Sequence, residues 1–154
     1  MELILWRHAD AEDANGKEDS ARELTKKGRK QAERMADWLR PRLDGGDWRI
    51  LVSPAKRALQ TVKPLDMPYG VSDAIGTGTS PGALLKEAGW PSGGANVLVV
   101  GHQPTLGEVA GKILGLDEDL AIRKGAIWWF IARGGEANID VVLKAVLAPD
   151  LLDD

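Results

Sequence analysis

The sequence of 154 residues contains no cysteine, which excludes disulfide bonds, thiol catalysis and thiolate metal sites. It also lacks any apolar run near the ~20 residues that a membrane span needs. The N-terminus lacks the three parts of a signal peptide, which are a basic start, an apolar stretch and a cleavage site. These absences predict a cytoplasmic protein with no membrane partner.

An excess of positive charge is missing as well. Lysine and arginine number 20 against 23 acidic residues, so the net charge is -3 and the pI is about 5.4. General nucleic-acid binders are usually basic, so this balance argues against a nucleic-acid partner, although it permits a small cationic pocket. The length fits one domain, residues 1–154, with a single substantial core.

Short, unbroken apolar runs predict strands that are buried on both faces, at residues 3–6, 50–52 and 97–100. Helical patterns lie between them. One covers residues 26–40 with Thr25 as N-cap, and others follow Ser53-Pro54, Ser80-Pro81 and Gln103-Pro104. Ser53 is expected to cap its helix.

The C-terminal part predicts a hairpin, with strands at 126–132 and 139–145 around the turn sequence RGGEAN. Trp128 and Trp129 should then point to opposite faces of the sheet. Strands that alternate with helices predict an α/β fold, a three-layer α/β/α sandwich around a mostly parallel, mixed sheet. Residues 64–80 are the least regular segment, and a long loop there calls for a functional explanation.

The sequence has only two histidines, and each directly follows a predicted buried strand, in LILWRH and VLVVGH. A third strand ends in ILVSPAKR. Ligands of open α/β sheets bind beyond the carboxyl ends of the strands, so Arg7, His8, Arg57 and His102 are expected to meet there. Guanidinium groups bind phosphate bidentately, and an imidazole that neighbouring cations keep neutral is able to attack phosphorus. The predicted ligand is therefore a phosphoryl group, with added positive potential from helix N-termini behind Ser53 and Gln103.

Four blocks in order, WRHAD, TKKG, VSPAKRALQT and VVGHQP, resemble the signatures of the histidine phosphatase superfamily, whose fold is phosphoglycerate mutase-like. The short length and SARELTKKG resemble its SixA-type phosphohistidine phosphatases. The resemblance implies that His8 is the nucleophile that becomes phosphorylated. It implies that Arg7, Arg57 and His102 bind the phosphate and stabilise its developing charge. It also implies a two-step hydrolysis that needs no metal and no cofactor.

Two departures from the family pattern affect the site. The first block commonly reads Arg-His-Gly, whereas Ala9 follows His8 here, which predicts a slightly altered pocket wall. The glutamate that serves larger members as general acid is missing, which leaves Asp73 and Asp10 as candidate proton donors. Phosphohistidine has a good leaving group without such an acid, so this absence favours a phosphoramidate substrate.

Other interpretations compete at several positions. His8, Asp10 and His102 are of the types that bind metals, but two adjacent arginines disfavour a dication. The stretch GTGTSPG lacks the ending of a P-loop and is better explained as a pocket wall. Ser53 fits a helix cap better than a nucleophile. The basic run from Lys26 to Arg34 is typical of a solvated helix face, with docking of an acidic partner as the alternative.

The sequence therefore predicts a phosphohistidine phosphatase that acts on a phosphotransfer domain of a signalling system. One alternative is a small-molecule phosphomonoesterase of the same superfamily. Another is a phosphate-sensing or protein-binding module without turnover. The phosphorylated partner, the proton donor and the oligomeric state stay open.

Overall fold

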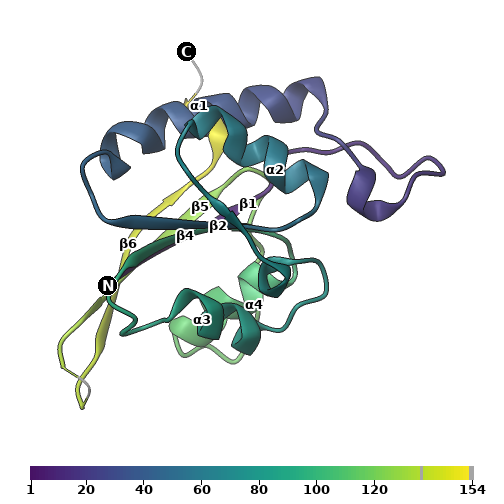
Figure 1. The fold of residues 1–154 in the computed structure, drawn as a ribbon. Helices are drawn as coiled ribbons and strands as arrows, with labels where there is room; N and C mark the ends of the chain where they lie inside the picture. Colours follow the sequence, from purple (N-terminus) through teal and green to yellow (C-terminus); the bar gives the residue numbers. More distant parts are fainter. Residues whose placement is uncertain (136, 153–154) are drawn as a thin grey trace.

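A computed structural model describes residues 1–135 and 137–152 and contains a six-stranded sheet in the order β3-β2-β4-β1-β5-β6 (Figure 1). The first four neighbours run parallel, whereas β5 is antiparallel to both β1 and β6. This confirms the predicted mixed sheet. The strands are β1 (Glu2–Arg7), β2 (Trp48–Val52), β3 (Gly70–Val71), β4 (Asn96–Gly101), β5 (Ile127–Arg133) and β6 (Asp140–Leu147).

Helices cover both faces of the sheet, as the three-layer prediction requires. Helices α1 (Lys26–Leu43) and α2 (Lys56–Val62) lie on one face, and α3 (Pro81–Ala88) and α4 (Thr105–Ile113) lie on the other (Figure 1). Short 3-10 turns complete the chain: η1 (Asp19–Ala21), η2 (Lys63–Leu65), η3 (Asp73–Ile75) and η4 (Pro149–Leu152). No helix within the described residues has the length and apolarity that crossing a membrane requires.

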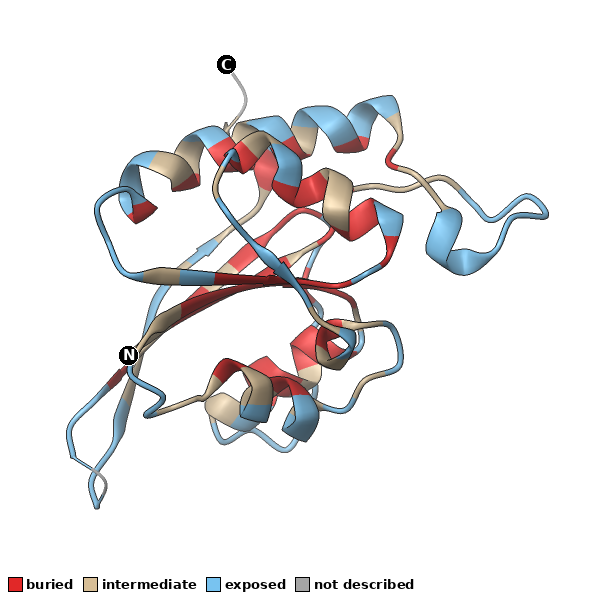
Figure 2. Cartoon of the chain, viewed as in Figure 1, coloured by how far each residue is buried: buried red, intermediate tan, exposed pale blue. Residues whose placement is uncertain are grey.

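Alternate residues of the central strand β1 supply the two halves of the core. Ile4 and Trp6 pack with α1 and α2, whereas Leu3 and Leu5 pack with α3 and α4. This is the two-sided burial expected of a central strand in a covered sheet. Figure 2 shows that buried residues concentrate in the central strands and on the helix surfaces that face them. The hairpin is confirmed, with Trp129 in one half of the core and Trp128 against the other, while Glu136 of its turn lies outside the described residues.

Helix starts follow the predicted caps at two of three positions. The Thr25 hydroxyl accepts a hydrogen bond from the Gly28 N–H at the start of α1, and Ser80 accepts one from Ala83 at the start of α3. The prediction for Ser53 was wrong, because α2 begins only at Lys56 and Ala55 is its N-cap. The Ser53 side chain has another partner, described below.

Residues 64–80 are more ordered than the sequence predicts. They contain η3 and the two-residue strand β3, which pairs with β2 at the sheet edge. Gly70 and Val71 are both exposed, so this strand has neither the alternation nor the apolar run by which a strand is recognised.

The register of the central strands places the two histidines side by side. Arg7 of β1 pairs with Gly101 of β4, so His8 and His102 follow at the same edge, and the His8 N–H donates to the Gly101 carbonyl at 3.0 Å. Beyond His8 the chain passes tightly under α1. A Cβ on Gly28 would lie 1.9 Å from the Asp10 carbonyl oxygen, which explains why glycine stands in TKKG.

Candidate active site

A hollow of about 210 Å³ lies at the carboxyl ends of β1, β2 and β4. Arg7, His8, Arg57 and His102 all line it, so the structure brings together the four residues that the sequence places at the strand ends. Five further residues line it: Ala11, Arg22, Thr77, Gln103 and Lys124. Thr77 comes from GTGTSPG, so this stretch forms part of the wall, as predicted.

His8 is held as a neutral imidazole with a defined free nitrogen. Its Nδ1 lies 2.8 Å from the Ala9 carbonyl oxygen, which only accepts hydrogen bonds, so Nδ1 carries the proton and Nε2 keeps its lone pair. Burial lowers the pKa of His8 to about 4; the hydrogen bond to Ala9 opposes this, and the charges of Arg57, Arg7 and Arg22 add to it. The sequence pointed to the cations, whereas desolvation is the larger cause.

His102 lies beside His8, with the two ring centroids 5.2 Å apart. Burial lowers its pKa to about 3, helped by His8 and by the charge of Arg57. Its Nε2 lies 2.7 Å from the Ser53 hydroxyl, which also accepts a hydrogen bond from the Ala55 N–H at 3.1 Å. Since the Ser53 oxygen already accepts from Ala55, its O–H is the group that donates to His102 Nε2. Nε2 is then the acceptor, which assigns the proton of His102 to Nδ1. Ser53 therefore orients His102.

Three buried nitrogen atoms of this site have no hydrogen-bond partner among the described residues: Arg7 Nε, Arg57 Nε and His102 Nδ1. A buried donor without a partner is costly and uncommon in folded proteins. All three belong to side chains that line the same hollow. Their common location indicates a site for an oxyanion, whose oxygens accept hydrogen bonds from several donors at once.

Arg22 and Asp19 are the site residues that the sequence reasoning missed. Arg57 donates from Nη1 to the Asp19 carbonyl (2.8 Å) and from Nη2 to its carboxylate (3.0 Å), and Arg22 Nε donates to the other carboxylate oxygen (3.1 Å). Burial raises the pKa of Asp19, but the hydrogen bonds and charges of Arg57 and Arg22 bring it below its usual value. Asp19 thus joins two guanidinium groups at the rim of the site.

Known proteins are similar to this chain over much of its length. The model of the histidine phosphatase superfamily (branch 1) matches residues 3–75. A phosphohistidine phosphatase SixA homologue of Haemophilus influenzae is 28% identical over 90% of this chain and 93% of its own. A solved structure of the protein histidine phosphatase SixA complexed with tungstate is 28% identical, covers 99% of this chain and 100% of its own, and superposes with a TM-score of 0.80. The chain belongs to the histidine phosphatase superfamily.

A second relative, an uncharacterised protein of Picosynechococcus, is 36% identical over 73% of each chain. The fold is also shared with a phosphoserine phosphatase of Entamoeba histolytica, which is 19% identical, covers 94% of this chain and 95% of its own, and has a TM-score of 0.70. Within the superfamily the chain is of the SixA type and is therefore a phosphatase. Its fold is phosphoglycerate mutase-like.

Neither predicted proton donor of this histidine phosphatase lines the hollow. Asp10 turns away: its carboxylate accepts hydrogen bonds from Thr25 Oγ1 at 2.6 Å and Lys124 Nζ at 3.1 Å. The hydrogen bond from Thr25 is the main cause that lowers the pKa of Asp10, so this carboxyl is a poor acid. Asp73 is exposed in the first turn of η3. The expectation for Asp10 was wrong because Thr25 and Lys124 draw its side chain to the start of α1.

Ala9 does not form part of the pocket wall, contrary to expectation. It is fully buried, and its methyl group packs with Leu24 and Ala32. Its φ is not in the left-handed region, so an alanine fits the backbone without strain. The main-chain groups of Ala9 are used instead, since its N–H donates to Thr61 Oγ1 at 3.0 Å and its carbonyl accepts from His8.

The described residues include no group of three or more His, Cys, Asp or Glu side chains placed to hold a metal ion. His8 and His102 face the same hollow, but Asp10, the third residue of the alternative metal site, does not. The donor groups that converge here are guanidinium, ammonium and imidazole N–H groups, which bind anions.

Proposed function

We propose that this protein hydrolyses phosphohistidine through a covalent phosphohistidine intermediate on His8, with a histidine-phosphorylated phosphotransfer protein as its substrate. The observation that carries the proposal is the lining of the hollow. It presents a neutral imidazole and four cationic side chains, and none of the described residues that line it has a carboxyl group. Similarity to the SixA relatives supports the same substrate class.

In the first step, the lone pair on His8 Nε2 attacks phosphorus and the P–N bond of the substrate breaks. When the second ring nitrogen of the substrate imidazole carries a proton, the ring leaves as a neutral molecule and takes up no proton. A phosphomonoester instead leaves as an alkoxide, which needs an acid at the site. The carboxyl-free lining thus suits phosphohistidine better than an alkyl phosphate.

In the second step, water attacks the phosphoryl group on His8. Nδ1 keeps its proton in the hydrogen bond to the Ala9 carbonyl, so the Nε2–P bond breaks and the His8 ring leaves as neutral imidazole, as the substrate ring did, while both protons of the water leave with the phosphate. We assign Arg7, Arg57 and His102 the role of binding the phosphoryl oxygens in both steps and stabilising their charge in each transition state, because all three side chains line the hollow and each has a nitrogen without a partner among the described residues. The similar SixA structure is complexed with tungstate, a tetrahedral oxyanion like phosphate, which supports oxyanion binding in this fold.

A comparison of substrates tests the proposal. We expect a histidine-phosphorylated protein and free phosphohistidine to be hydrolysed with kcat/KM at least about 100-fold above that of an alkyl phosphate, which lacks a good leaving group. An aryl phosphate should fall between them, and a chelator should change none of the rates. Faster turnover of the alkyl phosphate would favour the phosphomonoesterase alternative. Phosphate binding without turnover of any substrate would favour the sensing module.

The pH dependence should follow the depressed pKa of His8. Nucleophilic attack needs neutral His8, so kcat/KM falls as the pH drops through the pKa of the free enzyme, about 4, and is not halved near the ordinary value of 6.5. An aryl phosphate, corrected for its own ionisation, is the suitable substrate, with circular dichroism to confirm folding at each pH. Arg22→Gln removes one of the cations that lower the His8 pKa, so the fall in kcat/KM should occur at a higher pH. An acid limb at 6.5 in the unmodified enzyme contradicts the buried, neutral imidazole.

A further inference from the structure

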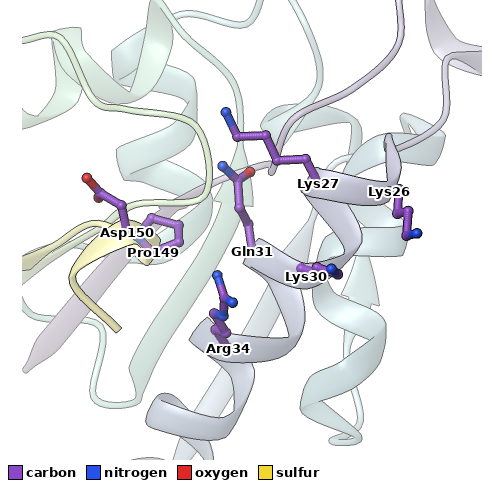
Figure 3. Close-up of a pocket in the computed structure, with 7 residues that line it drawn as sticks. All are labelled: Lys26, Lys27, Lys30, Gln31, Arg34, Pro149 and Asp150. Carbon is purple, nitrogen blue, oxygen red and sulfur yellow. The ribbon is translucent and has the colours of Figure 1, made fainter. Parts of the chain in front are cut away.

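A second hollow, of about 460 Å³, lies between the first turns of α1 and the C-terminal turn η4 (Figure 3). We call it the basic groove. It is lined by Lys26, Lys27, Lys30, Gln31 and Arg34 of α1 together with Pro149 and Asp150. In Figure 3, Gln31 and Arg34 lie on the side of α1 that faces Pro149 and Asp150, whereas Lys26 and Lys30 extend from the other side of the helix. Asp150 is its one acid, and this carboxylate pairs with Arg123 at 3.2 Å.

The cations of the groove lie at the N-terminal end of α1, where positive charge lowers helix stability. The first turn of α1 contains no acid, although acidic side chains are favoured at a helix N-terminus and cations are disfavoured there. Lys26 and Lys30 are also a like-charge pair at i,i+4 spacing. The last turn follows the usual preference, with Arg40 and Arg42. Helix stability therefore does not explain the basic start, and neither does composition, since the chain is acidic overall.

Hydrogen bonds of Asp10 connect the basic groove to the active site. Gln31, which lines the groove, accepts a hydrogen bond from the Asp10 N–H at 2.9 Å. The Asp10 carboxylate binds Lys124, which lines the active-site hollow, and the charge of Lys27 also lowers the Asp10 pKa. A protein whose phosphohistidine reaches His8 would thus cover Lys124, and its adjacent surface would contact the basic groove.

We propose that the basic groove docks a carboxylate-rich surface of the phosphorylated protein, beside its phosphohistidine; this inference rests on the proposed function. Lys26 and Lys30 are exposed, and within the described part of the chain no hydrogen bond or ion pair engages either ammonium group. Exposed cations of this kind attract a complementary acidic surface and fix its orientation. A small phosphorylated molecule in the active site is too short to gain from them.

The charge-reversed variant Lys26→Glu/Lys30→Glu tests the proposal. Its matched control is Lys86→Glu/Lys112→Glu, which reverses two exposed lysines on α3 and α4, on the opposite face of the sheet. One substrate is a phosphotransfer domain with acidic residues around its phosphohistidine, and the other is free phosphohistidine. The glutamates suit the start of α1, so the variant should fold, which circular dichroism checks.

For the phosphorylated domain we expect kcat/KM of the groove variant to fall by about 10- to 100-fold, mainly through KM, as for loss of electrostatic complementarity. Free phosphohistidine and the control variant should stay within about twofold, and high salt should bring the unmodified enzyme close to the groove variant. Neutralising the acidic residues of the domain should reproduce the loss.

An equal loss on free phosphohistidine would show that the lysines act on the phosphate site itself, and it would overturn docking. Unchanged turnover of the domain by the groove variant overturns the docking inference alone. Failure of the unmodified enzyme to release phosphate from either phosphohistidine substrate overturns the proposed function, and the docking inference with it.

Discussion

The variant His8→Ala is expected to lose turnover by at least about 10⁴-fold in kcat, the scale seen when a covalent nucleophile is removed. Nε2 of His8 is the atom with a free lone pair in the hollow, since Nδ1 is committed to the Ala9 carbonyl. No phosphorylated enzyme should form without it. The measurements are steady-state rates on free phosphohistidine and an aryl phosphate, and trapping of the acid-labile phosphoryl enzyme after mixing with substrate.

The same variant should still bind phosphate, because Arg7, Arg57 and His102 remain in place. Titration calorimetry with inorganic phosphate separates loss of the nucleophile from loss of the site, and Ser53→Ala is the matched control for the nucleophile. Ser53→Ala removes the partner of His102 Nε2, so it should reduce the rate but still form phosphohistidine on His8. Phosphate recovered on Ser53, or full activity of His8→Ala, contradicts the mechanism.

The variant Arg57→Ala is expected to lower kcat/KM by about 10²- to 10³-fold, the typical effect of deleting a preorganised charge-stabilising donor. Arg57 is 2% exposed, and its Nε has no partner among the described residues. It also depresses the pKa of both histidines, so its loss should shift the acid limb of the pH profile upward. Rates and phosphate affinity, measured over a range of pH, report these effects separately.

Two further variants sharpen this result. Arg57→Lys keeps the charge but loses the planar fork, so it should restore little of the activity. Arg49→Ala removes an arginine that pairs with Glu87 on the surface at 3.4 Å, and it should leave the rates unchanged. Full activity of Arg57→Lys would mean that charge alone suffices, and unchanged phosphate affinity in Arg57→Ala would remove Arg57 from the phosphate site.

The site residues that the sequence predicts are those that end a strand, directly follow one or lie in a helix. His8 and His102 end apolar runs that read as buried strands, and the parallel register of β1 and β4 then brings them together. Asp19 and Arg22 lie in the segment between β1 and α1, where no periodicity or apolar run indicates what a side chain faces. Arg22 lies in SARELTKKG, which pointed to a family without giving this residue a role, and Asp19 precedes that stretch.

Side-chain direction was the second thing that the pattern could not supply. Asp10 follows His8 by two residues, yet Thr25 and Lys124 draw its carboxylate out of the hollow. Ser53 has the residue type of a helix cap and precedes a proline, yet its hydroxyl forms a hydrogen bond with His102, which follows β4. Both depend on contacts between residues distant in the sequence, which local pattern does not encode.

The contact between His8 and Ala9 has a consequence for which changes this enzyme tolerates. The Nδ1 proton that defines the reactive tautomer is donated to a main-chain carbonyl, a group that every amino acid at position 9 supplies. The hydrogen bond therefore does not select the residue at position 9, whereas the packing does: the fully buried side chain contacts Leu24 and Ala32, which favours a small apolar residue. Alanine in place of the family's glycine therefore keeps the hydrogen bond that orients His8, because that bond depends on the path of the backbone and not on the side chain.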